Sequence, residues 1–179
     1  MALVLFLHGP SSSGKSTLAA EIRKQAAGRT FLHLSIDHLR DSGAWSPSAY
    51  EDWNTARPAF FSGFHRAVAG FATAGNDLIL EHILDTPGWQ AELRRLLAGQ
   101  QVFFVGLHTP LSTLVARETA RGDRPPGSAA ADFERARIAQ ANEGLSYDLI
   151  VDGTQPARIN AATILEALPQ PGTLSRFFD

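Results

Sequence analysis

The chain contains no cysteine, which excludes disulfide bonds and zinc sites built on thiolates. It has no surplus of positive charge either: the formal net charge is −2 and no basic stripe is visible, so we expect no nucleic-acid partner. It also lacks a hydrophobic run long enough to cross a bilayer. The apolar residues 1–10 carry no basic region and end in Gly-Pro, so we expect a core strand, no membrane partner and a cytoplasmic location.

What is present is typical of a globular protein. Hydrophobic residues make up 44% of the 179 positions and charged residues 19%, far from the proportions of disordered or membrane chains. This length suits one domain with a substantial core. Because we find no repeat or linker, we expect residues 1–179 to form a single domain.

Strand and helix patterns alternate along the chain. Short apolar runs predict five strands, at residues 3–8, 30–36, 77–84, 102–108 and 147–152. Apolar residues at helical spacing predict helices at residues 15–27, between Pro58 and Gly75, and at 87–98, 110–120, 129–142 and 156–168. The stretch after residue 37 is expected to be irregular or short-helical. This alternation predicts an α/β fold, a five-stranded parallel sheet flanked by helices on both faces, with ligands at the carboxyl ends of the strands.

The strongest motif follows the first predicted strand. Residues 9–16, GPSSSGKS, match the G-x-x-x-x-G-K-[ST] pattern of a phosphate-binding loop, or P-loop. Its glycines let successive N–H groups face one anion, Lys15 brings a cation to the β- and γ-phosphates, and Ser16 offers its hydroxyl to Mg²⁺. A flexible Gly/Ser turn would need no lysine at this point. We expect ATP, with GTP as the alternative, at Gly9, Pro10, Ser11, Ser12, Ser13, Gly14, Lys15, Ser16 and Thr17.

Two carboxylates stand at predicted strand ends. Asp37 follows the second strand, at the same sheet edge as the P-loop, and there it suits the base that takes the proton of an acceptor hydroxyl. The alternative for Asp37 is a helix N-cap. Glu81 ends the third strand and is expected to bind the acceptor or to orient a water on magnesium. A solvated strand end is the alternative for Glu81.

Three arginines, Arg117, Arg121 and Arg124, lie at the end of a predicted helix and in the Gly/Pro-bearing loop after it. Phosphoryl transfer depends on neutralising charge, so arginines on a closing lid would serve the nucleotide phosphates. We therefore expect a small arginine-rich lid over about residues 117–130, with Arg117 also beside a base-recognition loop near 153–158. The alternative is a solvated surface paired with Glu118 and Asp123.

Aromatic residues crowd the segment before the third strand. Phe60 and Phe64 are at helical spacing and are expected in the core. Trp45, Tyr50 and Trp53 lie in a polar context and are candidates for a pocket that holds a ring-bearing or apolar acceptor. We expect the acceptor-binding region over about residues 38–66.

The motifs together resemble the chloramphenicol phosphotransferase-like P-loop kinases. The resemblance rests on GPSSSGKS, on Ile36-Asp37, on RETARGDR at 117–124 and on EGLSYDLIVDGT at 143–154, and spans nearly the whole chain. It implies a P-loop kinase fold and transfer of the ATP γ-phosphoryl group to a hydroxyl of an antibiotic, which is thereby inactivated. Asp37 would be the base, with Lys15 and the lid arginines, Arg121 and Arg124, on the phosphates.

One segment departs from this family. The region between Asp37 and the third strand is compact and differently aromatic, so the acceptor stays open between chloramphenicol, a nucleoside antibiotic of the capuramycin type and an ordinary metabolite. We predict an ATP- and Mg²⁺-dependent O-phosphotransferase acting on a small-molecule hydroxyl. The alternatives are a metabolite, nucleotide or UDP-sugar kinase, and a nucleotide-dependent binding switch. The sequence does not indicate an oligomeric state or a role for the C-terminal tail.

Overall fold

The computed structural model describes residues 1–122 and 127–179. Its strands are β1 (Leu3–His8), β2 (Leu32–Ser35), β3 (Leu78–His82), β4 (Gln101–His108) and β5 (Leu149–Asp152). Its α-helices are α1 (Lys15–Gln25), α2 (Ile36–Asp41), α3 (Trp53–Thr73), α4 (Trp89–Leu96), α5 (Leu111–Arg121), α6 (Ser128–Glu143) and α7 (Ala157–Glu166). Two short 3₁₀ turns are η1 (Pro47–Ala49) and η2 (Arg176–Phe178).

The five strands form one parallel sheet in the order β2-β3-β1-β4-β5, as the alternating pattern predicted. β1 lies at the centre, and its six residues are all buried because helices cover both faces of the sheet. The pairing of β1 with β3 sets Leu7 opposite Glu81. This register brings Glu81 to the carboxyl edge of the sheet, beside the loop that leaves β1.

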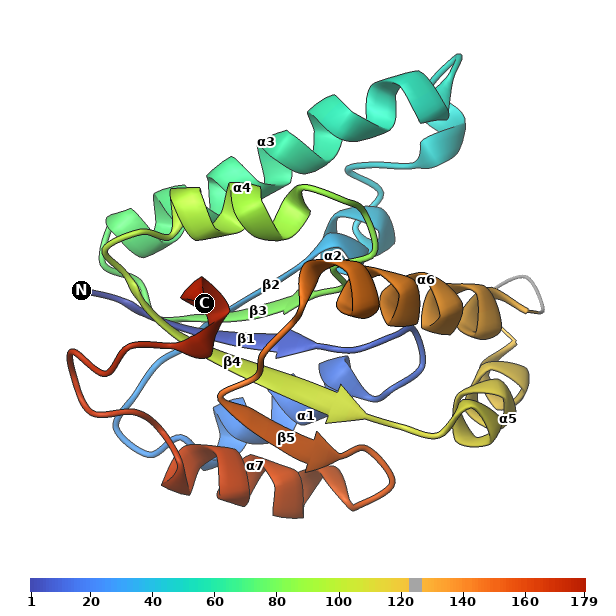
Figure 1. The fold of residues 1–179 in the computed structure, drawn as a ribbon. Coiled ribbons are helices and arrows are strands. Elements are labelled where there is room, and N and C mark those ends of the chain that lie inside the picture. Colours follow the sequence, from blue (N-terminus) through green and yellow to red (C-terminus); the bar gives the residue numbers. More distant parts are fainter. Residues whose placement is uncertain (123–126) are drawn as a thin grey trace.

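Each face of the sheet has its own core. Successive side chains of a strand point to opposite faces, so Val4 and Phe6 pack under α3 and α4 while Leu5 and Leu7 pack against α1 and α7. Figure 1 shows these helix pairs on opposite sides of the sheet, with α5 beyond the arrowheads of the strands. Ligand-binding loops are therefore gathered at that edge. Within the described residues, no helix is both long and apolar enough to cross a membrane.

The C-terminal tail is part of the core that lies between the sheet and helices α3 and α4. Phe177 is fully buried, and its ring lies 5.5 Å from that of Phe6 and 5.2 Å from that of Phe104, measured between centroids. The Nε of Arg94 donates to the carbonyl of Phe177 at 2.5 Å. The tail thus seals the edge of the core between β4 and α4.

Several boundaries differ from the prediction by a few residues, and two of these differences have a clear cause. The third helix begins at Trp53, before Pro58, because Asp52 caps it by accepting from the N–H of Asn54 at 3.0 Å. Pro58 lies inside that helix at the loss of one backbone hydrogen bond. The second strand ends at Ser35 because this serine caps α2, so that Asp37 already lies in a helical turn.

Candidate active site

The P-loop joins β1 to α1 through a strained backbone. Ser12 and Gly14 both have positive φ, 64° and 101°, and α1 begins at Lys15 with no capping side chain from Gly14. The first N–H groups of a helix lack partners within the helix, and the helix dipole is positive there. This end of α1 is therefore suited to bind an anion, as the motif predicted.

Lys15 is held against the loop itself. Its ammonium Nζ donates to the carbonyls of Gly9 and Pro10, each at 2.9 Å, and its side chain is buried. These bonds fold the lysine back across the loop. The cation thus lies against the P-loop and lines the cavity beside it.

Ser16 and Glu81 meet across two elements. The hydroxyl of Ser16 donates to Oε1 of Glu81 at 2.9 Å, and His33 lies 3.1 Å from Oε2. Burial favours a higher pKa for Glu81, but the hydrogen bonds from His33 and Ser16 and the charge of Lys15 outweigh it, so the pKa is lowered. Glu81 is thus a buried carboxylate that stays ionised beside the P-loop. The alternative, a carboxylate exposed to solvent at the strand end, is wrong.

Two of the predicted lid arginines contact the P-loop from α5. Arg117 donates to the carbonyl of Ser13 at 3.0 Å and to that of Gly153 at 2.8 Å. Arg121 donates to the hydroxyl of Ser12 at 3.0 Å. Arg117 thereby ties the P-loop to the loop after β5, whereas Arg124 lies outside the described residues.

Glu118 holds the two sides of the predicted lid together. It is 4% exposed, and its carboxylate accepts from the N–H groups of Gly127 at 3.0 Å and Ala129 at 2.6 Å, at the start of α6. The sequence suggested a surface ion pair as one possibility for this residue. Because a carboxylate complements the positive end of a helix, Glu118 instead joins α5 to α6.

A cavity of about 600 Å³, here called the P-loop cavity, opens over this site. Arg117, Arg121 and Asn160 line it together with the whole stretch from Ser11 to Leu18. Residues 153–157, which the sequence placed near the base of a nucleotide, line it as well. The lining thus brings the P-loop together with the segment in which the sequence predicts base recognition.

Asp37 also lines this cavity. The N-cap of α2 is Ser35, whose hydroxyl accepts from the N–H of Asp37 at 3.2 Å. Asp37 is therefore not the helix cap that the sequence offered as an alternative. The carboxylate pairs instead with Arg40 at 2.9 Å and remains half-buried. It lines both the P-loop cavity and a second one next to it.

The second cavity, of about 140 Å³, is here called the α3 cavity because Arg57 and Phe61 of α3 form one wall. Trp89 closes another wall, with its ring 4.3 Å from that of Phe61. The guanidinium of Arg57 lies over both rings, 5.0 Å from Phe61 and 4.7 Å from Trp89. The cavity thus combines an aromatic surface with charge.

The three aromatic residues expected in an acceptor pocket do not line the α3 cavity. Trp45 stacks on Phe60 at 4.5 Å between centroids, and Trp53 contacts both Trp45 and Tyr50. They pack together around the start of α3, and none of them lines the α3 cavity. Phe61 and Trp89 line that cavity, and a role of Trp45, Tyr50 and Trp53 in acceptor binding stays a prediction.

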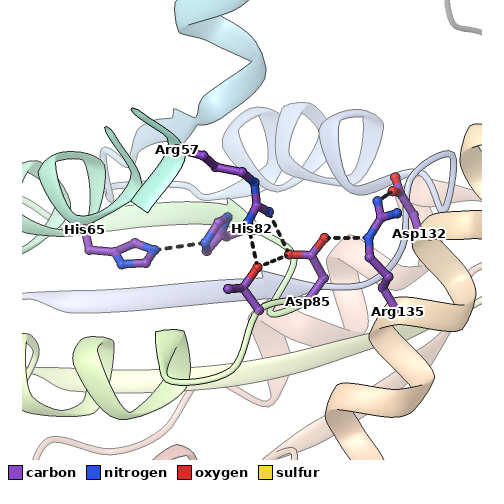
Figure 2. A network of polar contacts seen from close by, with 7 residues as sticks. Arg57, His65, His82, Asp85, Asp132 and Arg135 are labelled. Atoms are coloured by element: carbon purple, nitrogen blue, oxygen red, sulfur yellow. Dashed lines mark hydrogen bonds and ion pairs between the residues drawn. The ribbon is translucent and has the colours of Figure 1, made fainter. Parts of the chain in front are cut away.

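Two polar networks back the α3 cavity. In the first, Asp85 lies between Arg57 and Arg135, and Arg135 also pairs with Asp132 (Figure 2). In the second, His82 contacts His65 through their Nε2 atoms at 3.0 Å, and Nδ1 of His65 lies 2.7 Å from Glu92. Because these partners come from α3, α6 and the segments around β3 and α4, sequence spacing gave no signal for them.

Both histidines of the second network are held neutral. Burial lowers the pKa of His82 well below its ordinary value, and the charges nearby add to the effect. Burial also lowers the pKa of His65, more than Glu92 raises it. Glu92 can only accept a hydrogen bond, so His65 donates through Nδ1 and accepts from Nε2–H of His82. Each of the two imidazoles therefore has a defined tautomer, and their hydrogen bonds form a chain from His82 at the cavity wall to Glu92.

The five-stranded parallel sheet with a P-loop at its carboxyl edge defines a protein of the P-loop kinase fold. Solved structures support this assignment. A shikimate kinase from Acinetobacter baumannii in complex with shikimate is 22% identical, with a TM-score of 0.61 over 93% of this chain and 92% of that one. The Mycobacterium tuberculosis APS kinase CysC in complex with AMPPNP and APS is 19% identical, with a TM-score of 0.62 over 93% and 96%.

The family follows from the sequence comparison. The model for chloramphenicol phosphotransferase-like proteins matches residues 2–169, and the chain belongs to that family. A Mycobacterium tuberculosis H37Rv protein with the provisional name O-phosphotransferase Rv2636 is 26% identical over 174 residues, 84% of this chain and 75% of the relative. The chain is therefore a phosphotransferase, a kinase that acts on hydroxyl acceptors.

Proposed function

We propose that the chain transfers the γ-phosphoryl group of ATP to a hydroxyl of a small molecule, and that this acceptor is an antibiotic inactivated by the transfer. One observation carries the proposal. Ser11, Lys15, Asp37 and Glu81 line both the P-loop cavity and the α3 cavity. A phosphate chain in the first cavity and a hydroxyl in the second would meet at a cation and a carboxylate, as direct phosphoryl transfer requires.

Each residue at this junction has a task in the proposal. Lys15, which already bonds to two loop carbonyls, neutralises charge on the transferred group. Asp37 accepts the proton of the acceptor hydroxyl as the oxygen bonds to phosphorus. Arg121 and Arg124 would neutralise phosphate charge from the lid, and Arg117 would lie beside the nucleoside.

The donor set at Ser16 and Glu81 fits a magnesium ion. Mg²⁺ in kinases takes oxygen ligands from a hydroxyl, one or two carboxylates, waters and the phosphates themselves. The hydroxyl of Ser16 and the ionised Glu81 are 2.9 Å apart on the P-loop side of the sheet. We propose that these two side chains hold the ion, directly or through water, and that it supplies charge neutralisation at the phosphates.

An antibiotic acceptor is favoured by the family, whose description names chloramphenicol phosphotransferase. The aromatic wall of Phe61 and Trp89 suits a ring-bearing acceptor. ATP as the donor agrees with the APS kinase of the same fold, which is in complex with AMPPNP. Metabolite, nucleotide and UDP-sugar kinases, GTP as donor, and a nucleotide-dependent switch are the competing outcomes.

The test is Asp37→Asn assayed with γ-labelled ATP and a panel of hydroxylated antibiotics and metabolites. We expect transfer to fall by about 10²–10⁴-fold while nucleotide affinity is retained, because the amide keeps the shape and loses the base. Asp41→Asn is the matched control: Asp41 also pairs with Arg40, but it is exposed and lies outside both cavities.

Two results would contradict the proposal. Full transfer by Asp37→Asn would remove Asp37 from the role of base. ATP turnover that no acceptor alters, with no acceptor labelled, would favour the binding switch.

A further inference from the structure

The two cations that line the α3 cavity are both engaged. Lys15 bonds to the P-loop carbonyls of Gly9 and Pro10. Arg57 donates from Nη1 to the hydroxyl of Thr86 at 3.0 Å and from Nη2 to Asp85 at 3.4 Å. Its guanidinium is therefore turned to the wall of the cavity.

Asp85 organises this wall. Its side chain is 5% exposed and takes one arginine on each oxygen, Arg57 on Oδ1 and Arg135 on Oδ2, the latter at 3.0 Å. Arg135 also pairs with Asp132, so the four residues alternate in sign and their charges cancel (Figure 2). The chain of ion pairs joins α3, the loop after β3 and α6.

Each carboxylate that lines the cavity already has a cation beside it. Asp37 pairs with Arg40, and Glu81 lies under the influence of the charge of Lys15. Asp85 and Asp132 share the two arginines of the network. An acceptor carboxylate or phosphate entering here would lose its water and meet oxygens of the same charge. Among the described lining residues, no cation is left over to compensate it.

We propose that Asp85 determines the charge of the acceptor. By holding Arg57 and Arg135 it excludes anionic hydroxyl compounds and reserves the α3 cavity for uncharged ones that pack against Phe61 and Trp89. This inference rests on the proposed function, because it takes the α3 cavity as the acceptor site. It separates this chain from kinases whose acceptors are acids, although the fold is shared.

The test measures binding with the P-loop cavity filled by AMPPNP and Mg²⁺. Shikimate is the anionic probe and its methyl ester the uncharged one, each titrated by calorimetry into wild type and Asp85→Asn. We expect the variant to bind shikimate at least tenfold more tightly than wild type does, because two arginines lose their shared carboxylate. The affinity for the ester should change less than threefold.

Three further variants test whether a gain in shikimate affinity comes from the charge of Asp85. Asp85→Glu preserves the charge and should preserve the exclusion of shikimate. Asp132→Asn removes a carboxylate from the far end of the same network and should give at most a small gain, since Asp85 still holds both arginines. Adding Arg57→Gln to Asp85→Asn should remove most of the gained affinity, which simple loosening of the cavity would not do.

An unchanged shikimate affinity in folded Asp85→Asn, or equal gains for acid and ester, would overturn the proposal. If Asp85→Asn does not fold, the wild type can be tested instead. Pairs of an acid and its ester are added to the acceptor panel, and we measure which member of each pair the wild type labels from γ-labelled ATP. Preferential labelling of the acids would refute charge selection and leave the phosphotransferase intact. Because the titrations need no turnover, a failure of the proposed function shows up separately, as a panel without any labelled acceptor.

Discussion

The two halves of the proposed site, one for the phosphate donor and one for the acceptor, are built from different parts of the polypeptide. The donor half, formed by residues 9–17, Arg117, Arg121 and residues 153–157, is held mainly through backbone carbonyls and N–H groups. The acceptor half, formed by Arg57, Phe61, His82, Asp85 and Trp89, is held by contacts between side chains.

The partners in the acceptor half are also far apart in sequence. Asp85 is 28 residues from Arg57 and 50 from Arg135, and His65 is 27 from Glu92. A backbone-built site tolerates changes in surrounding side chains, whereas a site built from side-chain pairs changes with each of them. This difference explains how one fold can keep its donor and vary its acceptor.

The largest effect should come from the cation of the donor half. Lys15→Ala is expected to lower the rate of transfer by about 10²–10³-fold, since in the proposed mechanism it removes the charge that neutralises the transferred phosphoryl group. The chain has one other lysine, the exposed Lys24, which pairs with Glu21, and Lys24→Ala is the control. Turnover of γ-labelled ATP by the two variants would be compared. A rate for Lys15→Ala within tenfold of wild type would show that the loop works without its lysine.

The next largest effect should come from adding a side chain to a glycine, which tests how tightly the backbone around the donor half is packed. A Cβ at Gly153 would lie 1.9 Å from Oγ1 of Thr109 and 3.0 Å from the carbonyl of His108, so Gly153→Ala should cost about 1–3 kcal/mol of unfolding free energy. Gly70, in α3, has open space around it, and Gly70→Ala should stabilise by about 0.5–1 kcal/mol. Urea unfolding measures both. Equal unfolding free energies of the two variants would contradict tight packing of the backbone around Gly153.

A smaller effect concerns the buried imidazole of His8, the last residue of β1 before the P-loop. His8 contacts Tyr147 through Nδ1 at 2.8 Å, and burial, with the charges of Lys15 and His108, lowers its pKa to about 3. The unfolded chain has the ordinary pKa of 6.5 and takes up the proton first. Stability is therefore complete above pH 6.5 and declines as the pH falls from there toward 3.

For this single group the decline between pH 7 and pH 5 amounts to about 2 kcal/mol. His8→Asn, which keeps a polar atom near the position of Nδ1, should lose about that much less stability over this range in urea unfolding. His38→Asn removes an exposed imidazole that is not among the groups acting on His8, and serves as control. An unchanged pH dependence in His8→Asn would mean that His8 does not stay neutral in the native state.

Local patterns carried the prediction of the fold. Apolar runs bounded by glycine and proline identified five strands, and their alternation with helices predicted the parallel sheet that the structure has. The third helix was placed too late because a proline usually marks a boundary, whereas Asp52 and the packing of Trp53 on Phe60 and Phe61 extend this helix beyond Pro58. Capping and packing outweighed one lost hydrogen bond.

The sequence alone determined the donor half, because a P-loop needs only a contiguous motif between a strand and a helix, and it pointed to Asp37 because parallel strands end at one edge. Only the tertiary structure decided the acceptor half. It brought Arg57, Asp85 and Arg135 together, lined the cavity with Phe61 and Trp89, and gathered Trp45, Tyr50 and Trp53 into a cluster of their own. The physical reason is that a phosphate is bound by local backbone dipoles, whereas a small-molecule pocket is shaped by side chains that meet only after the chain has folded.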